Sequence, residues 1–308
     1  MDTQDTYPPV RKRKTLWAGL KEALYERFFQ ANGVLAVLIL LGIFSLLFVE
    51  GLPALKELGL GSFFLSSNWN PTSFVKESYG LLAMLVSTLM VTAGALVIAV
   101  PVGIAAAAYI ADVASPRMRE VVKPVIEILA GIPSVVVGFL GIIVVGPALA
   151  KLFGTSSGLN AINGSLLLAV MALPTIISIS EDAIVSVPQD FKSASLALGA
   201  NRWQTLVRVT LPSALSGIIA SVMLGMGRAI GETMTVLMAT GCAPAMPGSF
   251  FDSVRTMTST IAIELGETVQ GGIHYQSLFV IAFVLFLMTF LVNLVSDVVL
   301  QKYQKVQR

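Results

Sequence analysis

The chain has 308 residues, of which 55% are hydrophobic and only 12% are charged, and its formal net charge is +2. Average soluble domains are about 25% charged, and a soluble protein of this composition would expose large apolar patches. The composition therefore predicts an integral membrane protein. The single cysteine, Cys242, excludes an intrachain disulfide framework and a cysteine-based metal site, and no metal site is expected.

Six apolar stretches are long enough to cross a bilayer, since about 20 helical residues span a hydrocarbon core of ~30 Å. The second contains Pro101, which predicts a kink or a tilted helix. The expected spans are 33–51, 80–112, 125–150, 164–187, 214–241 and 277–300.

Positive charge is distributed unevenly between the two sides of this arrangement. Fifteen of the 20 Lys and Arg residues fall on the side of the two termini, four fall on the other side, and Arg228 lies within a span. Cytoplasmic loops carry the excess of Lys and Arg, so both termini are expected in the cytoplasm. A five-span arrangement would break this asymmetry. The basic run Arg11, Lys12, Arg13 and Lys14 predicts an anchor at the membrane surface and not a nucleic-acid site.

Two external segments connect the spans. Residues 52–79 contain "SSNWNPTSF", which predicts an interfacial loop or a short surface helix around Trp69 and Phe74. Residues 242–276 predict a loop that either contacts an external partner or only connects two spans. The only histidine, His274, lies in that segment, and we expect it to be exposed and inert.

The cytoplasmic segment 191–212, "FKSASLALGANRWQTLVRVTLP", does not have the composition of a loop. Helix formers precede Gly199, which can stop a helix, and a second helical pattern begins at Trp203. Two short helices that expose Trp and Leu are suited to an apolar groove on a cytoplasmic partner. The alternative is an amphipathic pair that lies on the bilayer.

The fifth predicted span contains "GMGRAIGETM" at 225–234, which places Arg228 and Glu232 four residues apart on one face of the expected helix. A charge near the bilayer centre costs about 2.5–3.5 kcal/mol on insertion scales. One explanation is a structural ion pair. The other is that both residues line an aqueous path, where the planar guanidinium suits phosphate-like oxyanions and Thr233 adds a hydroxyl.

A second irregular stretch is "EILAGIPSVVVGFLG" at 127–141, where Gly131, Pro133 and Ser134 interrupt the apolar run. Irregular backbone inside a span is tolerated where it faces protein or water. Ser134 is therefore a candidate path residue, and a simple packing kink is the alternative. Glu181 and Asp182 are expected at the cytoplasmic interface, where they can face a partner.

The cytoplasmic segment resembles the coupling loop of bacterial ABC importer permeases. That pattern is Glu-Ala-Ala, three residues, Gly, nine residues, an aliphatic residue, one residue and Leu-Pro. Ser193 stands where the family has Glu, so the contact of that Glu with the ATPase is not carried over. The residues expected to form the ATPase-coupling loop are Ser193, Ala194, Ser195, Gly199, Ala200, Trp203, Leu211 and Pro212.

The stretch 225–234 resembles the signature of phosphate permeases of the high-affinity phosphate-specific ABC system, and "YGLLAMLVSTL", "AVPVGIAAAAYIAD" and "GIPSVVVG" support it. "NWNP" and the Glu-Thr-Met after Gly231 resemble the C-type permease more than its A-type partner. The resemblance covers about residues 33–300. It implies an all-α membrane fold of the type I (MetI-like) importer class with six spans, and a phosphate path that includes Arg228 and Glu232.

The resemblance also implies partners: an A-type permease, a dimer of ATP-binding subunits, an external phosphate-binding protein and inorganic phosphate. The sequence has no GxxxxGK[ST] loop, so ATP and Mg are expected on the partner ATPase and no cofactor or enzymatic activity is expected in this chain. The expected location is the bacterial cytoplasmic (inner) membrane. The expected divisions are a tail at 1–32, a first span with its external loop at 33–79, a permease core at 80–300 and a tail at 301–308.

Three alternatives stay open at this point. One is a permease of the same architecture for another oxyanion or small nutrient, and another is a secondary transporter or channel. The third is a membrane scaffold without transport, which would give Arg228 no solute to meet. The sequence shows no clear internal repeat of the kind that secondary transporters often carry.

Overall fold

A computed structural model of the chain describes residues 16–306, so the basic run at 11–14 lies outside the described residues. Contacts between residues divide the chain into two compact units, 1–47 and 48–308. The predicted divisions at 32, 79 and 300 stay predictions. The elements are α1 (Leu16–Leu58), α2 (Leu60–Leu65), β1 (Trp69–Asn70), β2 (Ser78–Tyr79), α3 (Leu82–Ala108), η1 (Tyr109–Val113), α4 (Pro116–Gly131), α5 (Ser134–Leu140), η2 (Gly141–Val145), α6 (Gly146–Phe153), α7 (Ala161–Val185), α8 (Gln189–Ala197), α9 (Arg202–Thr205), η3 (Leu206–Thr210), α10 (Leu211–Ser213), α11 (Leu215–Gly231), α12 (Met234–Ala239), α13 (Met257–Glu264) and α14 (Ile273–Val306), where η marks π-helical turns.

The prediction of an all-helical membrane fold is confirmed. Within the described residues, five helices are long and apolar enough to span a membrane, and a bent pair of helices would make a sixth span. The five are Leu24–Leu58, Leu82–Val113, Ser134–Phe153, Ala161–Val185 and Ile273–Val298, and the pair is Arg202–Ser213 with Leu215–Gly231, bent by 69°.

The first unit contains the helical residues 16–47 of α1. The helix begins at Leu16, inside the segment predicted as a tail, so the first apolar stretch is the continuation of a longer helix. Its apolar side chains, such as Leu35 and Ile39, are exposed. Exposed apolar side chains along a helix of this length are typical of a span that faces lipid.

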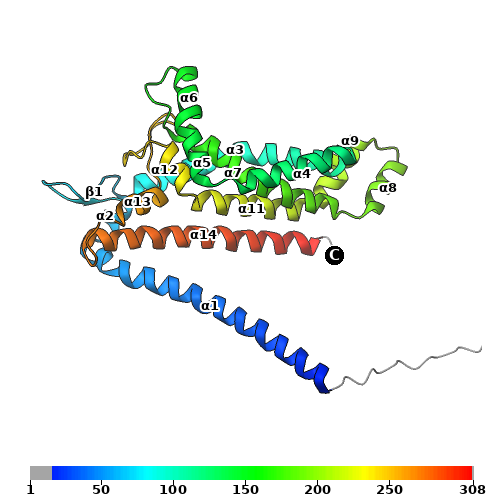
Figure 1. The fold of residues 1–308 in the computed structure, drawn as a ribbon, viewed down its shortest axis with the longest axis horizontal. Coiled ribbons are helices and arrows are strands. Elements are labelled where there is room, and N and C mark those ends of the chain that lie inside the picture. Colours follow the sequence, from blue (N-terminus) through cyan, green and yellow to red (C-terminus); the bar gives the residue numbers. More distant parts are fainter. Residues whose placement is uncertain (1–15, 307–308) are drawn as a thin grey trace, which may run out of the picture. The chain divides into compact units, whose positions relative to one another are not determined.

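The second unit is built around long helices that pack side by side. Figure 1 shows α3, α7, α11 and α14 running side by side, and α7 packs against both α3 and α11. The interior between them consists largely of small residues, among them Ala95, Ala99 and Ala172. Small side chains let helices approach closely, which is the usual basis of helix association in membranes.

Two of the predicted spans are each divided into two helices in the structure. The third was expected as one helix over 125–150, but α4 ends at Gly131 and a separate helix starts at Ser134. The fifth was expected over 214–241, but α11 ends at Gly231 and α12 begins at Met234. Pro133 explains the first break, because it lacks an N–H and forces the preceding residue into an extended conformation.

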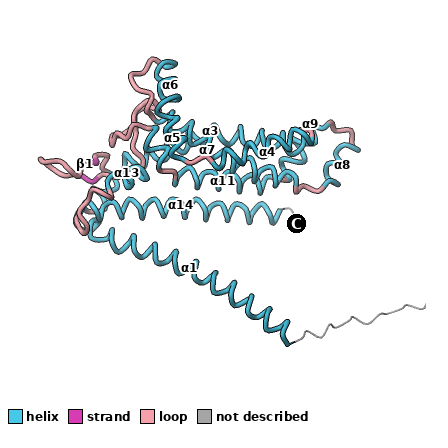
Figure 2. Tube along the Cα trace, in the orientation of Figure 1, coloured by secondary structure: helices cyan, strands magenta, loops and turns pink. Residues whose placement is uncertain are grey.

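The segments predicted to be external are more ordered than the sequence indicated. Residues 69–79 form a β-hairpin in which Trp69 pairs with Tyr79 and Trp69 is buried, so Trp69 does not lie in an irregular surface segment, while the short helix α2 precedes the hairpin in the predicted segment. The segment 242–276 contains helix α13, which packs against α14. Figure 2 shows these loops and the hairpin at one end of the helices, with α8 and α9 at the opposite end.

His274 was expected to be exposed and inert, and the structure contradicts this. Its side chain is 22% exposed, and its Nε2 lies 2.8 Å from Oε2 of Glu264. The same carboxylate is bonded by the Arg255 guanidinium at 2.6 Å. The histidine is therefore part of a hydrogen-bonded network that joins α13 to the start of α14.

Candidate solute path and coupling loop

Arg228 is an exposed cation in the last turn of α11. The structure gives it one hydrogen bond, from Nη1 to the hydroxyl of Thr175 on α7, at a long 3.4 Å. No ion pair within 4.0 Å joins it to an acid among the described residues. A guanidinium has five N–H donors, so most of the donors of Arg228 are left for water or for an anion.

Glu232 does not share a helical face with Arg228, because α11 ends at Gly231 and Glu232 has extended backbone angles, φ −69° and ψ 128°. The predicted structural ion pair between them is not formed. The Glu232 carboxylate instead accepts a hydrogen bond of 3.4 Å from the backbone N–H of Thr235, at the start of α12. Its carbonyl accepts one of 3.0 Å from the hydroxyl of Thr258 on α13. Glu232 therefore fixes the geometry of the break.

The two helix breaks are directly connected. The hydroxyl of Thr235 on α12 donates a hydrogen bond of 3.0 Å to the backbone carbonyl of Ser134 on α5. The predicted path residues Ser134 and Thr233 are both partly buried, one at each break, and the Thr233 hydroxyl donates to the carbonyl of Gly231 at 3.3 Å. The structure thus brings the two irregular stretches together, as transporter folds do when broken helices border a solute path.

The glycines near the breaks have different surroundings. A Cβ on Gly225 would lie 2.8 Å from the Ile176 side chain, so this glycine lets α11 approach α7. Gly131 and Gly231, which directly precede the two breaks, have no atom within 4 Å of the Cβ position. Open space therefore lies beside the two breaks, whereas α11 and α7 are closely packed at Gly225.

Sequence reasoning missed Thr175 and assigned no specific contact to Thr235. Thr175 follows Pro174 in the interior of α7, and a proline there removes a backbone hydrogen bond. A threonine directly after a proline in a predicted span could have marked Thr175 as a candidate path residue. The sequence could not show that Thr175 lies beside Arg228, because that contact depends on how α7 packs against α11.

Glu181, which is expected at the cytoplasmic interface, is buried in an ion pair near the end of α7. Its side chain is only 4% exposed, and a carboxylate oxygen lies 2.9 Å from Nζ of Lys123 on α4. Removing one partner of such a pair would leave a buried charge without compensation, which is costly. The pair therefore fastens α4 to α7, while Asp182 is exposed.

The coupling loop has the predicted helix–turn–helix shape. Helix α8 ends at Ala197, and Gly199 adopts φ +87°, in the left-handed region. Asn201 caps α9: its side chain accepts from the backbone N–H of Gln204 at 2.8 Å, and the Gln204 side chain accepts from the N–H of Asn201 at 3.0 Å. This reciprocal capping box defines the start of the second helix.

The predicted coupling residues are arranged as a compact unit with an apolar exterior. Trp203 and Leu198 are exposed by 70% and 90%. The hydroxyls of Ser195 and Thr205 lie 3.0 Å apart and join the two short helices. Ser193, at the position of the family Glu, donates to the carbonyl of Asp190 on its own helix at 3.1 Å. Leu211 and Pro212 form α10, at the bend before α11.

An ion pair ties the coupling loop to the end of α3. Nζ of Lys192 on α8 lies 2.7 Å from Oδ1 of Asp112 in η1, and both side chains are largely buried, at 12% and 23% exposure. The guanidinium of Arg119 on α4 bonds the carbonyls of Ile110 and Ala111 in the same turn. The π-helical turn is thus held from both sides, so a displacement of α8 acts on α3 and α4 together.

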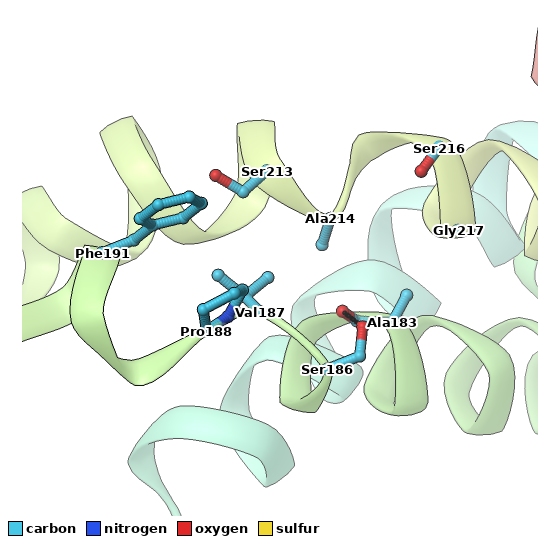
Figure 3. Close-up of a pocket in the computed structure, with 9 residues that line it drawn as sticks. All are labelled: Ala183, Ser186, Val187, Pro188, Phe191, Ser213, Ala214, Ser216 and Gly217. Atoms are coloured by element: carbon cyan, nitrogen blue, oxygen red, sulfur yellow. Dashed lines mark hydrogen bonds between the residues drawn. The ribbon is translucent and has the colours of Figure 1, made fainter. Parts of the chain in front are cut away.

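A cavity of about 600 Å³ lies between the end of α7, the start of α8 and the bend from α10 to α11. Figure 3 shows Phe191 opposite Ser213 at one end of it, and Ser216 and Gly217 at the other. None of its lining residues is charged, so it lacks the features of an anion site. Such a space beside a bend leaves room for α8 to shift against α11. The lining residues are Ala183, Ser186, Val187, Pro188, Phe191, Ser213, Ala214, Ser216 and Gly217.

The single cysteine gives a simple test of the external structure. Burial raises the pKa of the Cys242 thiol, although the nearby Arg255 opposes this. A raised pKa means less thiolate at neutral pH, and the thiolate is the reactive form. We expect Cys242 to react with N-ethylmaleimide at pH 7.5 roughly tenfold more slowly than a cysteine placed at the exposed Val269. Mass spectrometry of the timed reaction measures both rates, and equal rates would contradict the buried placement.

The bundle of spans with two connected breaks and an exposed coupling loop defines a membrane permease of the importer type. Residues 99–305 match the family of binding-protein-dependent transport system inner membrane components, and the chain belongs to this family.

Relatives and solved structures agree with this assignment. The chain is 40% identical over 79% of each chain to the probable ABC transporter permease protein YqgH of Bacillus subtilis. It is 32% identical over 97% of each chain to the phosphate transport system permease protein PstC of Mesorhizobium japonicum. A bacterial alginate ABC transporter has a similar fold, with a TM-score of 0.59 over 91% of this chain and 95% of that chain at 17% identity. The MetNI methionine ABC transporter gives 0.54 over 73% and 94% at 19% identity.

Proposed function

We propose that this chain is the C-type permease subunit of an ATP-driven importer of inorganic phosphate in the bacterial inner membrane. The observation that carries the proposal is Arg228, an exposed and unpaired cation among the described residues, beside two connected helix breaks. The similarity to phosphate transport permeases supports phosphate as the solute.

The proposal includes the remaining subunits of the importer. A separate dimer of ATP-binding subunits, which holds ATP and Mg, receives the exposed Trp203 and Leu198 of the coupling loop. A homologous A-type permease forms the other wall of the path, and an external phosphate-binding protein delivers the solute. Both termini lie in the cytoplasm, since the Lys and Arg residues are concentrated on that side. This chain itself is not an enzyme, and lipid covers its outer surface.

The proposed path residues are Arg228, Glu232, Thr233 and Ser134, to which the structure adds Thr175. Thr175 holds one N–H of Arg228, and the remaining donors offer an oxyanion the planar fork that such anions prefer. Binding by a single cation is weak, which suits a site that must release its solute. Glu232 holds the break open through Thr235 and Thr258.

A permease for another oxyanion is the remaining candidate, because Arg228 alone does not distinguish phosphate from sulfate. Uptake of radioactive phosphate by cells that express the whole importer decides between them. We expect excess unlabelled phosphate to compete and excess sulfate to leave the uptake unchanged. Competition by sulfate at equal concentration would overturn phosphate as the specific solute.

The ion pair between Lys192 and Asp112 is expected to transmit movement of the coupling loop. We expect Lys192→Asp to lower the phosphate taken up per ATP hydrolysed by roughly fivefold to tenfold, since two acids would then face each other. The double variant Lys192→Asp with Asp112→Lys restores the pair and is expected to recover uptake to within about twofold. Uptake and ATP hydrolysis measured on the same proteoliposomes give the ratio, and a double variant no better than the single one would contradict the role.

A further inference from the structure

The β-hairpin at the external end carries a fully exposed apolar tip. Its strands pair Trp69 with Tyr79 and Asn70 with Ser78. Between them, Phe74 and Val75 have relative exposures of 107% and 97%, the highest among the exposed large hydrophobic residues that the structure describes. Exposing a phenylalanine to this extent is unfavourable unless something covers it.

The base of the hairpin is held rigidly. The indole N–H of Trp69 lies 3.1 Å and 3.0 Å from the two carboxylate oxygens of Glu264 on α13. The Trp69 ring also packs edge to face against Tyr79, with centroids 5.8 Å apart, and against His274 at 6.1 Å. Because Arg255 and His274 bind the same carboxylate, four separate segments meet at the base.

Close backbone contact adds to this rigidity. The N–H of Gly80 donates to the carbonyl of Asn68 at 2.8 Å, and a Cβ at Gly80 would lie only 2.4 Å from the carbonyl oxygen of Ser66. Only glycine therefore fits at the end of the second strand. The tip is thus presented by a fixed support and not by a loosely connected loop.

The direction of the hairpin argues against lipid as its partner. Figure 1 shows it extending past the start of α14, away from the long helices that would lie in the membrane. The tip is flanked by the polar residues Ser73, Lys76 and Glu77. An element that inserts into lipid would lie along the spans, whereas this hairpin extends beyond their end.

A hollow of about 340 Å³ lies beside the hairpin base. Asn70 and Thr72 border it on the hairpin side, and Arg255, Glu264 and Glu267 border it on the other. A folded protein could contact this surface at two points, the projecting apolar tip and the polar hollow. An apolar anchor beside polar contacts is typical of protein–protein interfaces.

We propose that the 69–79 hairpin is a docking element for the external binding protein of the importer, with Phe74 and Val75 inserted into an apolar depression on that protein. The proposal rests on the proposed function. The family to which the chain belongs is named for transport that depends on a binding protein. A rigid anchor loses little conformational freedom on docking, so its apolar residues contribute most of their burial to affinity.

The test is the ATP hydrolysis of the complete importer in nanodiscs, titrated with phosphate-loaded binding protein. We expect Phe74→Ala to raise the concentration of binding protein for half-maximal stimulation by roughly tenfold or more, and to retain the maximal rate. Leu152→Ser, which removes an exposed apolar residue from α6, outside the hairpin and its hollow, is the matched control and should not change that concentration. An unchanged half-maximal concentration for Phe74→Ala would overturn the proposal.

The wild-type complex separates this proposal from the proposed function. If phosphate-loaded binding protein fails to stimulate even the wild type, the assignment as a phosphate importer fails. If it stimulates the wild type and Phe74→Ala equally, only the docking role fails.

A fluorescent probe decides whether lipid occupies the tip instead. Bimane is attached to Phe74→Cys in a Cys242→Ser background and its emission is followed in nanodiscs. A blue shift on addition of binding protein is expected. A blue-shifted spectrum before that addition would show a lipid contact and contradict the proposal.

Discussion

Arg228→Ala is expected to reduce phosphate uptake by at least about 100-fold while the protein still inserts and assembles. The side chain makes no ion pair among the described residues, and its one hydrogen bond, to Thr175, is long at 3.4 Å. Its removal therefore breaks no buried pair and leaves no buried charge uncompensated. Uptake of radioactive phosphate and co-purification of the ATPase subunits are measured on the same preparation.

Two control variants show whether the loss of uptake is specific to the Arg228 side chain. Arg117→Ala removes an exposed positive charge from the start of α4, at the opposite end of that helix from the first break, and should leave uptake within about twofold of wild type. Arg228→Lys keeps the charge but loses the planar fork, so intermediate uptake is expected. Normal uptake by Arg228→Ala would remove the residue from the path, and loss of assembly would indicate a structural role.

Gly199→Pro is expected to uncouple transport from ATP hydrolysis by at least about tenfold. Gly199 has φ +87°, whereas proline fixes φ near −65°, and the N–H of Gly199 donates to the carbonyl of Leu196 at 3.0 Å. Proline therefore breaks both the turn and its hydrogen bond. The exposed Trp203 and Leu198 would then no longer be presented together.

A second variant at position 199 separates the effect of backbone conformation from the effect of side-chain size. A Cβ at Gly199 would have no atom within 4 Å, so a larger side chain meets no obstacle there. Asn tolerates the left-handed region, and Gly199→Asn is therefore expected to retain coupling within about twofold. Uptake per ATP hydrolysed is the measured ratio. Equal ratios for the Pro and Asn variants would show that the turn conformation is irrelevant to coupling.

Sequence patterns predicted most of the helical fold because the bilayer imposes one requirement, a long apolar helix, on every span. The coupling loop was equally predictable, since Gly199 and the Asn201 cap act locally. The breaks were harder to locate. Gly131 and Pro133 marked the first, but the second, after Gly231, has no proline, and α11 ends there through tertiary contacts such as that between Glu232 and Thr258.

The partners of charged and aromatic side chains were the least predictable part. Glu264 gathers Arg255 and His274, which are nine and ten residues away, together with Trp69, which is 195 residues away, and no helical or strand spacing indicates such a meeting. The same holds for Thr175 beside Arg228 and for Lys123 beside Glu181. Helical spacing predicted that Arg228 and Glu232 share one face of a helix, and this failed because the helix ends between them.

Water accessibility at position 228 tests the central claim most directly. The assembled importer carrying Arg228→Cys and Cys242→Ser is treated in nanodiscs with a charged, membrane-impermeant methanethiosulfonate reagent, with and without ATP. We expect modification at a rate that changes with ATP and falls when phosphate is present, while Leu291→Cys, at an exposed apolar position of α14, stays unmodified. A cysteine at 228 that no charged reagent reaches in either state would contradict a solvated path at this residue.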